Sequence, residues 1–453
     1  MKNRKERYVM EKRFSNQDLR KLIIPLFLEQ LLVMLVGIAD TFMVSFAGDA
    51  AVSGVSLVNM LVTFFIYVFT ALASGGAVIV SQYIGKNDKD NASYTAGQLL
   101  MVSILVSAFC TLFVLVVNRQ IVSLLFGRVE NDVMTACVSY QRIMAFSYVP
   151  LGVYNAGAAI CRSMSRTEIT LKISVVANII NVAGNAIGIF VLHAGVEGVA
   201  WPSFFARLFS AAAVTVFCVN RKNLVCYQPE YIFTRDAETV KKIFSVAIPN
   251  SIENGAFQLI KVALSGITAM FGTVQIAANG IAQSIWSLAA LMVVTMGPVF
   301  ITVIGQCMGA GDVKGADYYF RKLTKITMVA AILWNVLVFA LTPVIMEFYP
   351  LSKEIRHLVI KLVLIHNIFS ATAWPLGGAL PNGLRAAGDV KFTMIITVAS
   401  TVFVRLLLSV VFGIWMNMGV VGIAWAMVCD WIARGIIYVA RYRQGKWKTM
   451  EVV

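Results

Sequence analysis

Two carboxylates lie inside an apolar stretch that is long enough to cross a bilayer. The stretch runs from Ile23 to Ser45 and contains Glu29 and Asp40, eleven residues apart. On a helix this spacing is about three turns, so both side chains project from nearly the same face. An ionisable group at membrane depth costs a few kcal/mol and is rarely kept there without a task. These residues predict a transport site built partly on this helix.

A row of amides occurs on a second apolar stretch. Asn178, Asn181 and Asn185 are spaced by three and four residues, which places them on one face of a helix. Their side chains offer neutral oxygen ligands and N–H donors that could orient Asp40 or a bound cation. A Na⁺ ion at Asp40 and Asn181 is one reading, and a proton on Asp40 is the other. Ordinary polar packing between helices is the alternative.

Other candidates are weaker. Glu253 is a second intramembrane carboxylate, which suits either a second cation site or a structural role. For Glu29 we favour a structural role near the mouth of its lobe. Lys261, eight residues after Glu253, is a candidate ion-pair partner. Aromatic rings can stack on cationic compounds, although packing is the more common use. The weak substrate-binding candidates are Glu29, Phe64, Tyr154, Phe257 and Trp286.

Composition places the whole chain in a membrane. Of 453 residues, 59% are apolar and only 13% are charged, and the mean hydropathy is +0.78. In soluble domains about 25% of the residues are charged. The net charge of +15 falls mostly in alternate loops, which indicates orientation and not a nucleic-acid surface. The seven cysteines show no metal-ligand spacing, and no ATPase or protease motif occurs, so we expect no enzyme activity and no cofactor.

The apolar pattern predicts an all-α integral membrane protein with twelve transmembrane helices. The excess of Lys and Arg in alternate loops puts both termini on the cytoplasmic side of the cell membrane. The predicted spans are 18–46, 53–83, 93–117, 134–157, 168–192, 196–220, 241–271, 277–305, 321–343, 356–378, 390–414 and 420–442.

The second half of the chain repeats the first at a constant offset. Pro25 matches Pro249, Glu29 matches Glu253, and the loop 82–88 matches 306–312 as Gln-x-x-Gly-x-x-Asp. Each half holds six spans, an even number, so the two six-helix lobes should be related by a pseudo-two-fold axis along the membrane normal. The expected units are an N-lobe (1–220), a cytoplasmic linker (221–240) and a C-lobe (241–453). Because one chain already supplies both lobes, we expect a monomer to be sufficient for function.

The two halves differ where the candidate site lies. The repeat counterpart of Asp40 is Leu264, so the shared architecture does not require this carboxylate. The counterpart of Asn181 is Arg405. A cation at that position makes the C-lobe an unlikely copy of the N-lobe site.

The Pro-x-x-x-Glu start of the first span, the segment Ile38-Ala-Asp-Thr-Phe-Met-Val44 and the repeated Gln-x-x-Gly-x-x-Asp loops resemble the MATE family (multidrug and toxic compound extrusion). The resemblance implies a V-shaped pair of six-helix bundles and the export of amphipathic, often cationic, compounds in exchange for Na⁺ or H⁺. It assigns Asp40 to cation binding and matches Asn181 to a ligand. The position of Asn185 often holds Asp in the family, so this chain would have a less negative site.

We therefore expect a cation-coupled antiporter that works by alternating access on a small-molecule substrate in the lipid bilayer. A flippase for a lipid-linked precursor is the first alternative, but such proteins need a strongly cationic cavity and deep cations are few here. A gated channel is the second, and the sequence shows no filter-like loop or charged ring.

Overall fold

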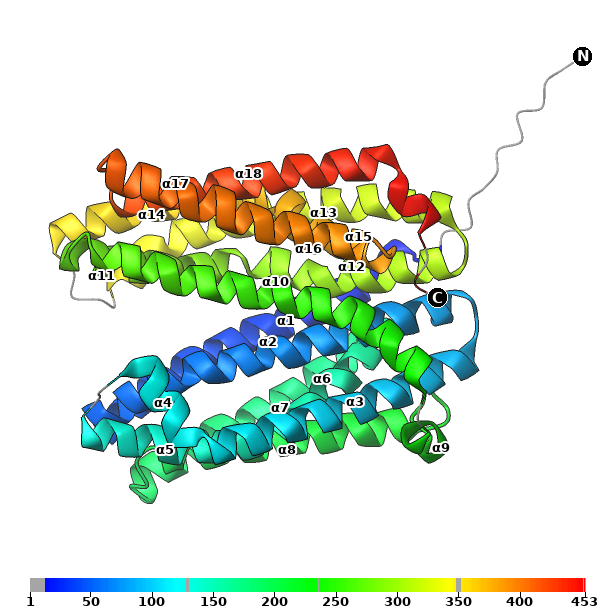
Figure 1. Cartoon of the computed structure of the whole chain (residues 1–453), viewed down its shortest axis with the longest axis horizontal. Coiled ribbons are helices and arrows are strands. Elements are labelled where there is room, and N and C mark those ends of the chain that lie inside the picture. Colours follow the sequence, from blue (N-terminus) through cyan, green and yellow to red (C-terminus); the bar gives the residue numbers. More distant parts are fainter. Residues whose placement is uncertain (1–12, 128–129, 235, 348–351, 451, 453) are drawn as a thin grey trace, which may run out of the picture.

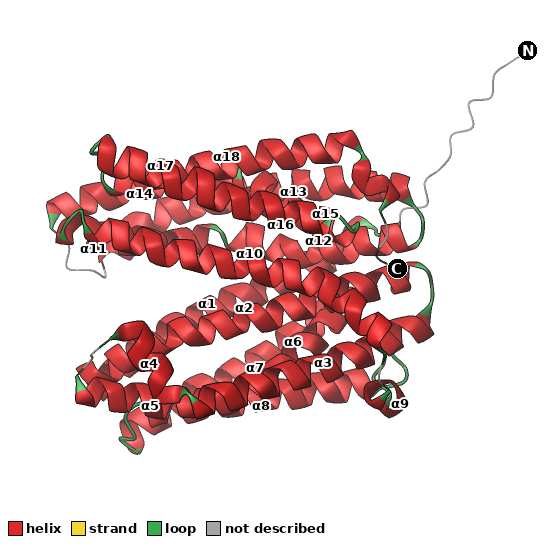
Figure 2. Cartoon of the chain, in the orientation of Figure 1, coloured by secondary structure: helices red, strands yellow, loops and turns green. Residues whose placement is uncertain are grey.

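The computed structural model describes residues 13–127, 130–234, 236–347, 352–450 and 452. Within these ranges the chain is built of helices joined by short loops and contains no strand (Figure 2). Two bundles of helices lie one above the other in Figure 1, and the two halves of the chain form one bundle each. The predicted all-α fold with two lobes is therefore confirmed.

The first half of the chain forms the N-lobe. Its fourth predicted span is two helices, α5 and α6, that meet at Ser147 with a bend of 44°. A π-helical turn, Ile187–Val191, continues α7. The elements are α1 (Asn16–Val44), α2 (Asp49–Gly85), α3 (Lys89–Val116), α4 (Asn118–Phe126), α5 (Asn131–Phe146), α6 (Tyr148–Ser163), α7 (Thr167–Ala186) and α8 (Glu197–Val219).

The second half forms the C-lobe after a connection that contains the short helix α9 (Pro229–Phe233). Three π-helical turns interrupt its helices, at Pro375–Ala379, Ser400–Leu406 and Val411–Trp415. The elements are α10 (Ala237–Ala269), α11 (Thr273–Ala289), α12 (Leu291–Gly309), α13 (Val313–Glu347), α14 (Lys353–Thr372), α15 (Leu380–Ala386), α16 (Val390–Ala399), α17 (Leu407–Val410) and α18 (Val420–Gln444).

The twelve predicted spans correspond to these helices. In the described chain, ten helical segments are long and apolar enough to cross a membrane, and the bent pair α5–α6 makes eleven. The twelfth is α10, which is 33 residues long but carries Glu253 and Lys261 among its apolar residues. The predicted span 277–305 is α11 and α12 in succession, with a break at Ala290.

The two lobes meet along α2. Helices α10 and α12 of the C-lobe both pack on it, and small apolar side chains fill the junction, among them Ala73 and Ala77 from α2, Val246 from α10 and Ile301 from α12. The lobes lie together at the end that holds α9 and α15 and separate toward the end that holds α4 and α11 (Figure 1).

The repeat extends to the turns. Gly48 and Gly272, which are repeat counterparts, precede α2 and α11 with φ of 98° and 87°. Side chains with a Cβ rarely adopt this region, so glycine is the residue that lets the chain reverse there. The same turn therefore ends the first helix of each lobe.

Candidate functional site

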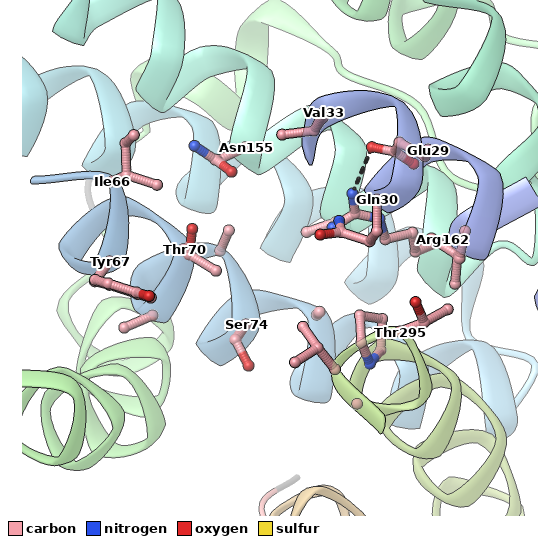
Figure 3. Close-up of a pocket in the computed structure, with 18 of the residues that line it drawn as sticks. Glu29, Gln30, Val33, Ile66, Tyr67, Thr70, Ser74, Asn155, Arg162 and Thr295 are labelled. Atoms are coloured by element: carbon pink, nitrogen blue, oxygen red, sulfur yellow. Dashed lines mark hydrogen bonds and ion pairs between the residues drawn. The ribbon is translucent and has the colours of Figure 1, made fainter. Parts of the chain in front are cut away.

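A cleft of about 860 Å³ opens between the lobes. Its N-lobe wall comes from α1, α2, α6, α7 and α8, and its C-lobe wall from α10, α12, α15, α18 and the π-helical turn before α15. Figure 3 shows Glu29 and Gln30 of α1, Tyr67 and Thr70 of α2, and Arg162 of α6 around this space. The predicted site residues that line it are Glu29, Asp40, Tyr154, Asn178, Asn181 and Glu253.

One amide of the row on α7 meets Asp40, because α1 packs on α7. Asn185 Nδ2 donates to Asp40 Oδ1 at 2.7 Å. The same amide nitrogen lies 3.3 Å from Asn181 Oδ1, and Asn181 Nδ2 donates to Ser203 Oγ at 3.0 Å. These contacts form a chain that leads from α8 through α7 to Asp40 on α1. Asn178 stands apart and donates to Ser174 on its own helix at 3.4 Å.

This row of hydrogen bonds leaves a side-chain oxygen without a donor. Asn185 is fully buried, and its Oδ1 accepts no hydrogen bond in the described part of the molecule. A buried acceptor without a donor is costly, and a cation beside it would satisfy it. No group of three Asp, Glu, His or Cys side chains able to hold a metal occurs among the described residues. A cation here would therefore be held by one carboxylate and by neutral oxygens.

Arg207 of α8 also lines the cleft and interacts electrostatically with Asp40. Its Nη1 donates to Ser147 Oγ at 2.6 Å, and it forms no ion pair in the described ranges. Arg207 was not among the predicted site residues, although it lies inside the predicted span 196–220. Because Arg207 already places a positive charge near Asp40, the site favours a proton or a monovalent cation over a divalent ion.

Glu29 lies in a saturated network. Its Oε1 receives Arg162 Nη2 at 2.9 Å and Tyr154 Oη at 3.2 Å, and its Oε2 receives Thr170 Oγ1 at 2.7 Å. The side chain is only 4% exposed, and both carboxylate oxygens accept hydrogen bonds from protein groups. This arrangement agrees with the structural role favoured for Glu29, at the edge of the cleft.

Glu253 forms an equivalent pair in the C-lobe. Its Oε2 lies 2.5 Å from Arg385 Nη2 of α15. The sequence suggested Lys261 as the partner, which was wrong, because α15 brings Arg385 to the carboxylate while Lys261 lies toward a separate pocket of the C-lobe. Arg162 and Arg385 lie outside the predicted spans 134–157 and 356–378, so the sequence predicted neither pair. The sequence does relate these two arginines to each other. Their separation along the chain is one residue shorter than the separation of Glu29 and Glu253, so they occupy nearly equivalent positions in the repeat.

The aromatic candidates divide between two places. Tyr154 lines the cleft, whereas Phe64, 44% exposed, is not part of its wall. Phe257 and Trp286 line the separate C-lobe pocket. Aromatic residues that do line the cleft include Tyr67 and Trp374.

Comparison with known proteins supports one family over most of the chain. The sequence pattern of the MatE family matches residues 25–187 and again 249–411. The chain is 28% identical over 442 residues to "Uncharacterized transporter YisQ" of Bacillus subtilis, covering 93% of each protein. It is 22% identical to "Probable multidrug resistance protein NorM" of Thermotoga maritima, covering 96% of this chain and 94% of the relative.

Solved structures share the fold. One described as "Crystal structure of MATE in the straight conformation" superposes with a TM-score of 0.89 at 18% identity, over 96% of this chain and 97% of the other. Another, "Outward-facing conformation of a multidrug resistance MATE family transporter of the MOP superfamily", gives 0.88 at 19% identity over 96% of each chain.

Proposed function

The chain belongs to the MatE family of transporters, and we propose that it is an antiporter that exports amphipathic cations in exchange for Na⁺ or H⁺. No covalent chemistry is part of this cycle. The coupling ion binds Asp40, with Asn181 and Asn185 as neutral ligands or orienting donors. The exported compound occupies the cleft between the lobes.

The observation that carries this proposal is the state of Asp40. Glu29 and Glu253 are both held by arginines, whereas Asp40 forms no ion pair within the described ranges and its one side-chain donor is an amide. Asp40 is half-buried, and a carboxylate that is partly removed from water without an ion-pair partner is stabilised when it takes up a proton or a monovalent cation. Occupation of Asp40 thus changes the relative free energy of states that expose and bury it, which is what coupling requires.

The cleft suits amphipathic guests. Most of its wall is apolar, with Tyr67, Tyr154 and Trp374 as aromatic surfaces, and aromatic faces attract cations. Its arginines are largely neutralised, since Arg162, Arg385 and Arg434 all form ion pairs with carboxylates. This balance does not match the strongly cationic cavity expected of a flippase for pyrophosphate-linked lipids.

We further propose that the chain acts as a monomer in the cell membrane with both termini in the cytoplasm. In that orientation the end where the lobes meet faces the cytoplasm, and the end where they separate faces outward (Figure 1). The cycle then requires the lobes to separate at the cytoplasmic end and close at the other. Helix α1, continuous from Asn16 to Val44 despite Pro25, carries Asp40 near the outer end.

The test uses purified protein in liposomes. Uptake of ethidium is followed against an imposed Na⁺ gradient and, separately, against a proton gradient, for the wild type, Asp40→Asn and the control Asp49→Asn, an exposed carboxylate at the start of α2. We expect transport driven by one gradient, loss of it in Asp40→Asn and wild-type rates in Asp49→Asn. Transport that survives in Asp40→Asn would remove Asp40 from coupling, and conduction without a driving gradient of either ion would favour a channel.

A further inference from the structure

The C-lobe contains a second, small pocket that the antiport cycle does not use. Its volume is about 90 Å³, and it lies between α10, α11, α14, α18 and the π-helical turn Ser400–Leu406. The polar and aromatic side chains around it are Phe257, Lys261, Ser265, Thr268, Asn279, Gln283, Trp286, His366 and Arg405. Three of these side chains carry or can carry positive charge, and no carboxylate is among the described residues that line the pocket.

Several donors in this pocket have no partner. Arg405 is 6% exposed, and its Nε makes no hydrogen bond to any described residue. His366 is 1% exposed with both ring nitrogens unpaired in the described chain, and Trp286 Nε1 is likewise buried and unpaired. The Phe257 ring centre lies 5.2 Å from the guanidinium carbon of Arg405, a contact that uses the face of the cation and leaves its N–H edge free.

The carboxylate that interacts electrostatically with Arg405 is Asp430, and it already has other partners. Asp430 Oδ2 is bonded by Arg434, and Asp430 Oδ1 receives Ser400 Oγ at 2.6 Å. Arg405 therefore forms no ion pair of its own in the described chain, and the carboxylate that acts on it is shared with Arg434. Buried charges in proteins are normally paired, and an intramembrane charge without a partner indicates a ligand.

The repeat shows where this pocket stands in the architecture. Leu264, Arg405 and Met427, which line it, are the counterparts of Asp40, Asn181 and Ser203 in the N-lobe, all three related by the same offset.

Arg405 lies in the π-helical turn Ser400–Leu406 and is buried, as its counterpart Asn181 is. π-Helical turns of this kind are frequent at functional sites.

From this geometry we infer that the C-lobe pocket binds a small monovalent anion, at the place where the N-lobe holds its candidate cation site. Arg405 is the counter-charge, with His366 and Trp286 as further N–H donors. A pocket of about 90 Å³ admits a halide or a single carboxylate group and excludes a drug-sized molecule. The inference does not depend on which ion drives transport.

The test measures Tm of the full-length protein in detergent while sodium bromide replaces sodium gluconate at constant Na⁺ concentration and ionic strength. We expect a saturable rise in Tm for the wild type, because a ligand that binds only the folded state stabilises it. Arg405→Met should abolish the rise, and Arg405→Lys should require more bromide to reach it. The matched control is Lys361→Met, a cation on α14 outside the pocket, which should respond as the wild type does.

A second measurement does not depend on the folding of a variant. Crystals of the wild type grown with bromide should show an anomalous peak among Arg405, His366 and Trp286. A parallel Tm series with acetate identifies the class of anion that binds. A response to both acetate and bromide means that the pocket accepts carboxylates, and a response to bromide alone means that it accepts an inorganic anion. An unsaturable bromide effect that is equal in all variants, or a bromide map without a peak in the pocket, would overturn the inference.

Discussion

Gln82 and Gln306, which are counterparts in the sequence repeat, each donate a hydrogen bond into the opposite lobe. Gln82 Nε2 of α2 lies 2.8 Å from the carbonyl oxygen of Ala386, and Gln306 Nε2 of α12 lies 2.9 Å from that of Ser163. Both side chains are buried. The repeated Gln-x-x-Gly-x-x-Asp loops thus form a two-fold clasp at the end where the lobes meet.

Removal of the clasp should favour separation of the lobes at this end. Each buried hydrogen bond contributes about 1 kcal/mol, so Gln82→Ala with Gln306→Ala should shift the equilibrium between closed and open states by roughly tenfold or more. Distances between spin labels placed on α3 and α16 would report the shift. The control is Gln141→Ala, a buried glutamine of α5 that makes no side-chain hydrogen bond to a described residue. Unchanged distance distributions in the double variant would contradict the role of the clasp.

The glycines of the same loops should be intolerant of a methyl group. A Cβ at Gly85 would lie 2.2 Å from the carbonyl oxygen of Gln306, and one at Gly309 would lie 1.9 Å from that of Gln82. Because these neighbours are backbone atoms, Gly85→Ala or Gly309→Ala should hold the lobes apart and reduce transport strongly. Gly255→Ala on α10, where nothing lies within 4 Å of the added carbon, should transport normally. Wild-type closure in Gly85→Ala, measured with the same spin labels, would refute this expectation.

The Glu29–Arg162 pair should behave as a structural unit. Glu29→Gln leaves a largely buried guanidinium without its counter-charge, a change that costs roughly 3 kcal/mol, and it should lower Tm markedly. Adding Arg162→Met should restore part of the loss, because no charge is then left unpaired. A double-mutant cycle in Tm tests this, and strictly additive effects would disprove coupling. The exposed pair Arg166–Glu168 is the control, for which removal of either partner should have little effect.

Substitution of Asn185, which bonds Asp40, should change the ion dependence of transport more than substitution of Asn178 on the same helix. Asn185→Leu removes the 2.7 Å hydrogen bond to the carboxylate. Because this bond stabilises the ion-free carboxylate, its loss should shift the ion dependence of transport by roughly tenfold, toward tighter binding when the ion is a proton. Asn178→Leu removes only a 3.4 Å contact with Ser174 and should leave ion dependence nearly unchanged. Initial rates of ethidium uptake at graded ion concentrations would compare the two. Equal ion dependence in both variants would count against the role of Asn185.

Acid should weaken the start of α3. The Asn91 side chain and backbone N–H both bond Asp88 and hold the pKa of this carboxyl below its ordinary value of 3.8. A lowered pKa means that the stabilisation is present above the ordinary value and is lost as the pH falls through the folded-state pKa. The Tm difference between the wild type and Asp88→Ala should therefore be constant near neutrality and shrink below about pH 4. Asp90→Ala, an exposed neighbour, should show no such difference.

The sequence by itself determined the twelve spans and the six-plus-six repeat, since hydrophobic length and a constant offset are properties of the chain alone. It also placed Asn178, Asn181 and Asn185 on one helix face, because spacings of three and four determine which side chains share a face. The contact of Asn185 with Asp40 depends on the packing of α7 against α1. The constant offset of the repeat also identified the glycines of the two Gln-x-x-Gly-x-x-Asp loops.

Only the tertiary structure decided the partners. Glu29 meets Arg162 at a separation of 133 residues, and Glu253 meets Arg385 at 132, and helical periodicity says nothing about such contacts. Lys261 shares a helix with Glu253, yet the carboxylate pairs with the arginine that α15 brings to it. Local spacing determines faces, whereas the packing of helices determines which charges meet.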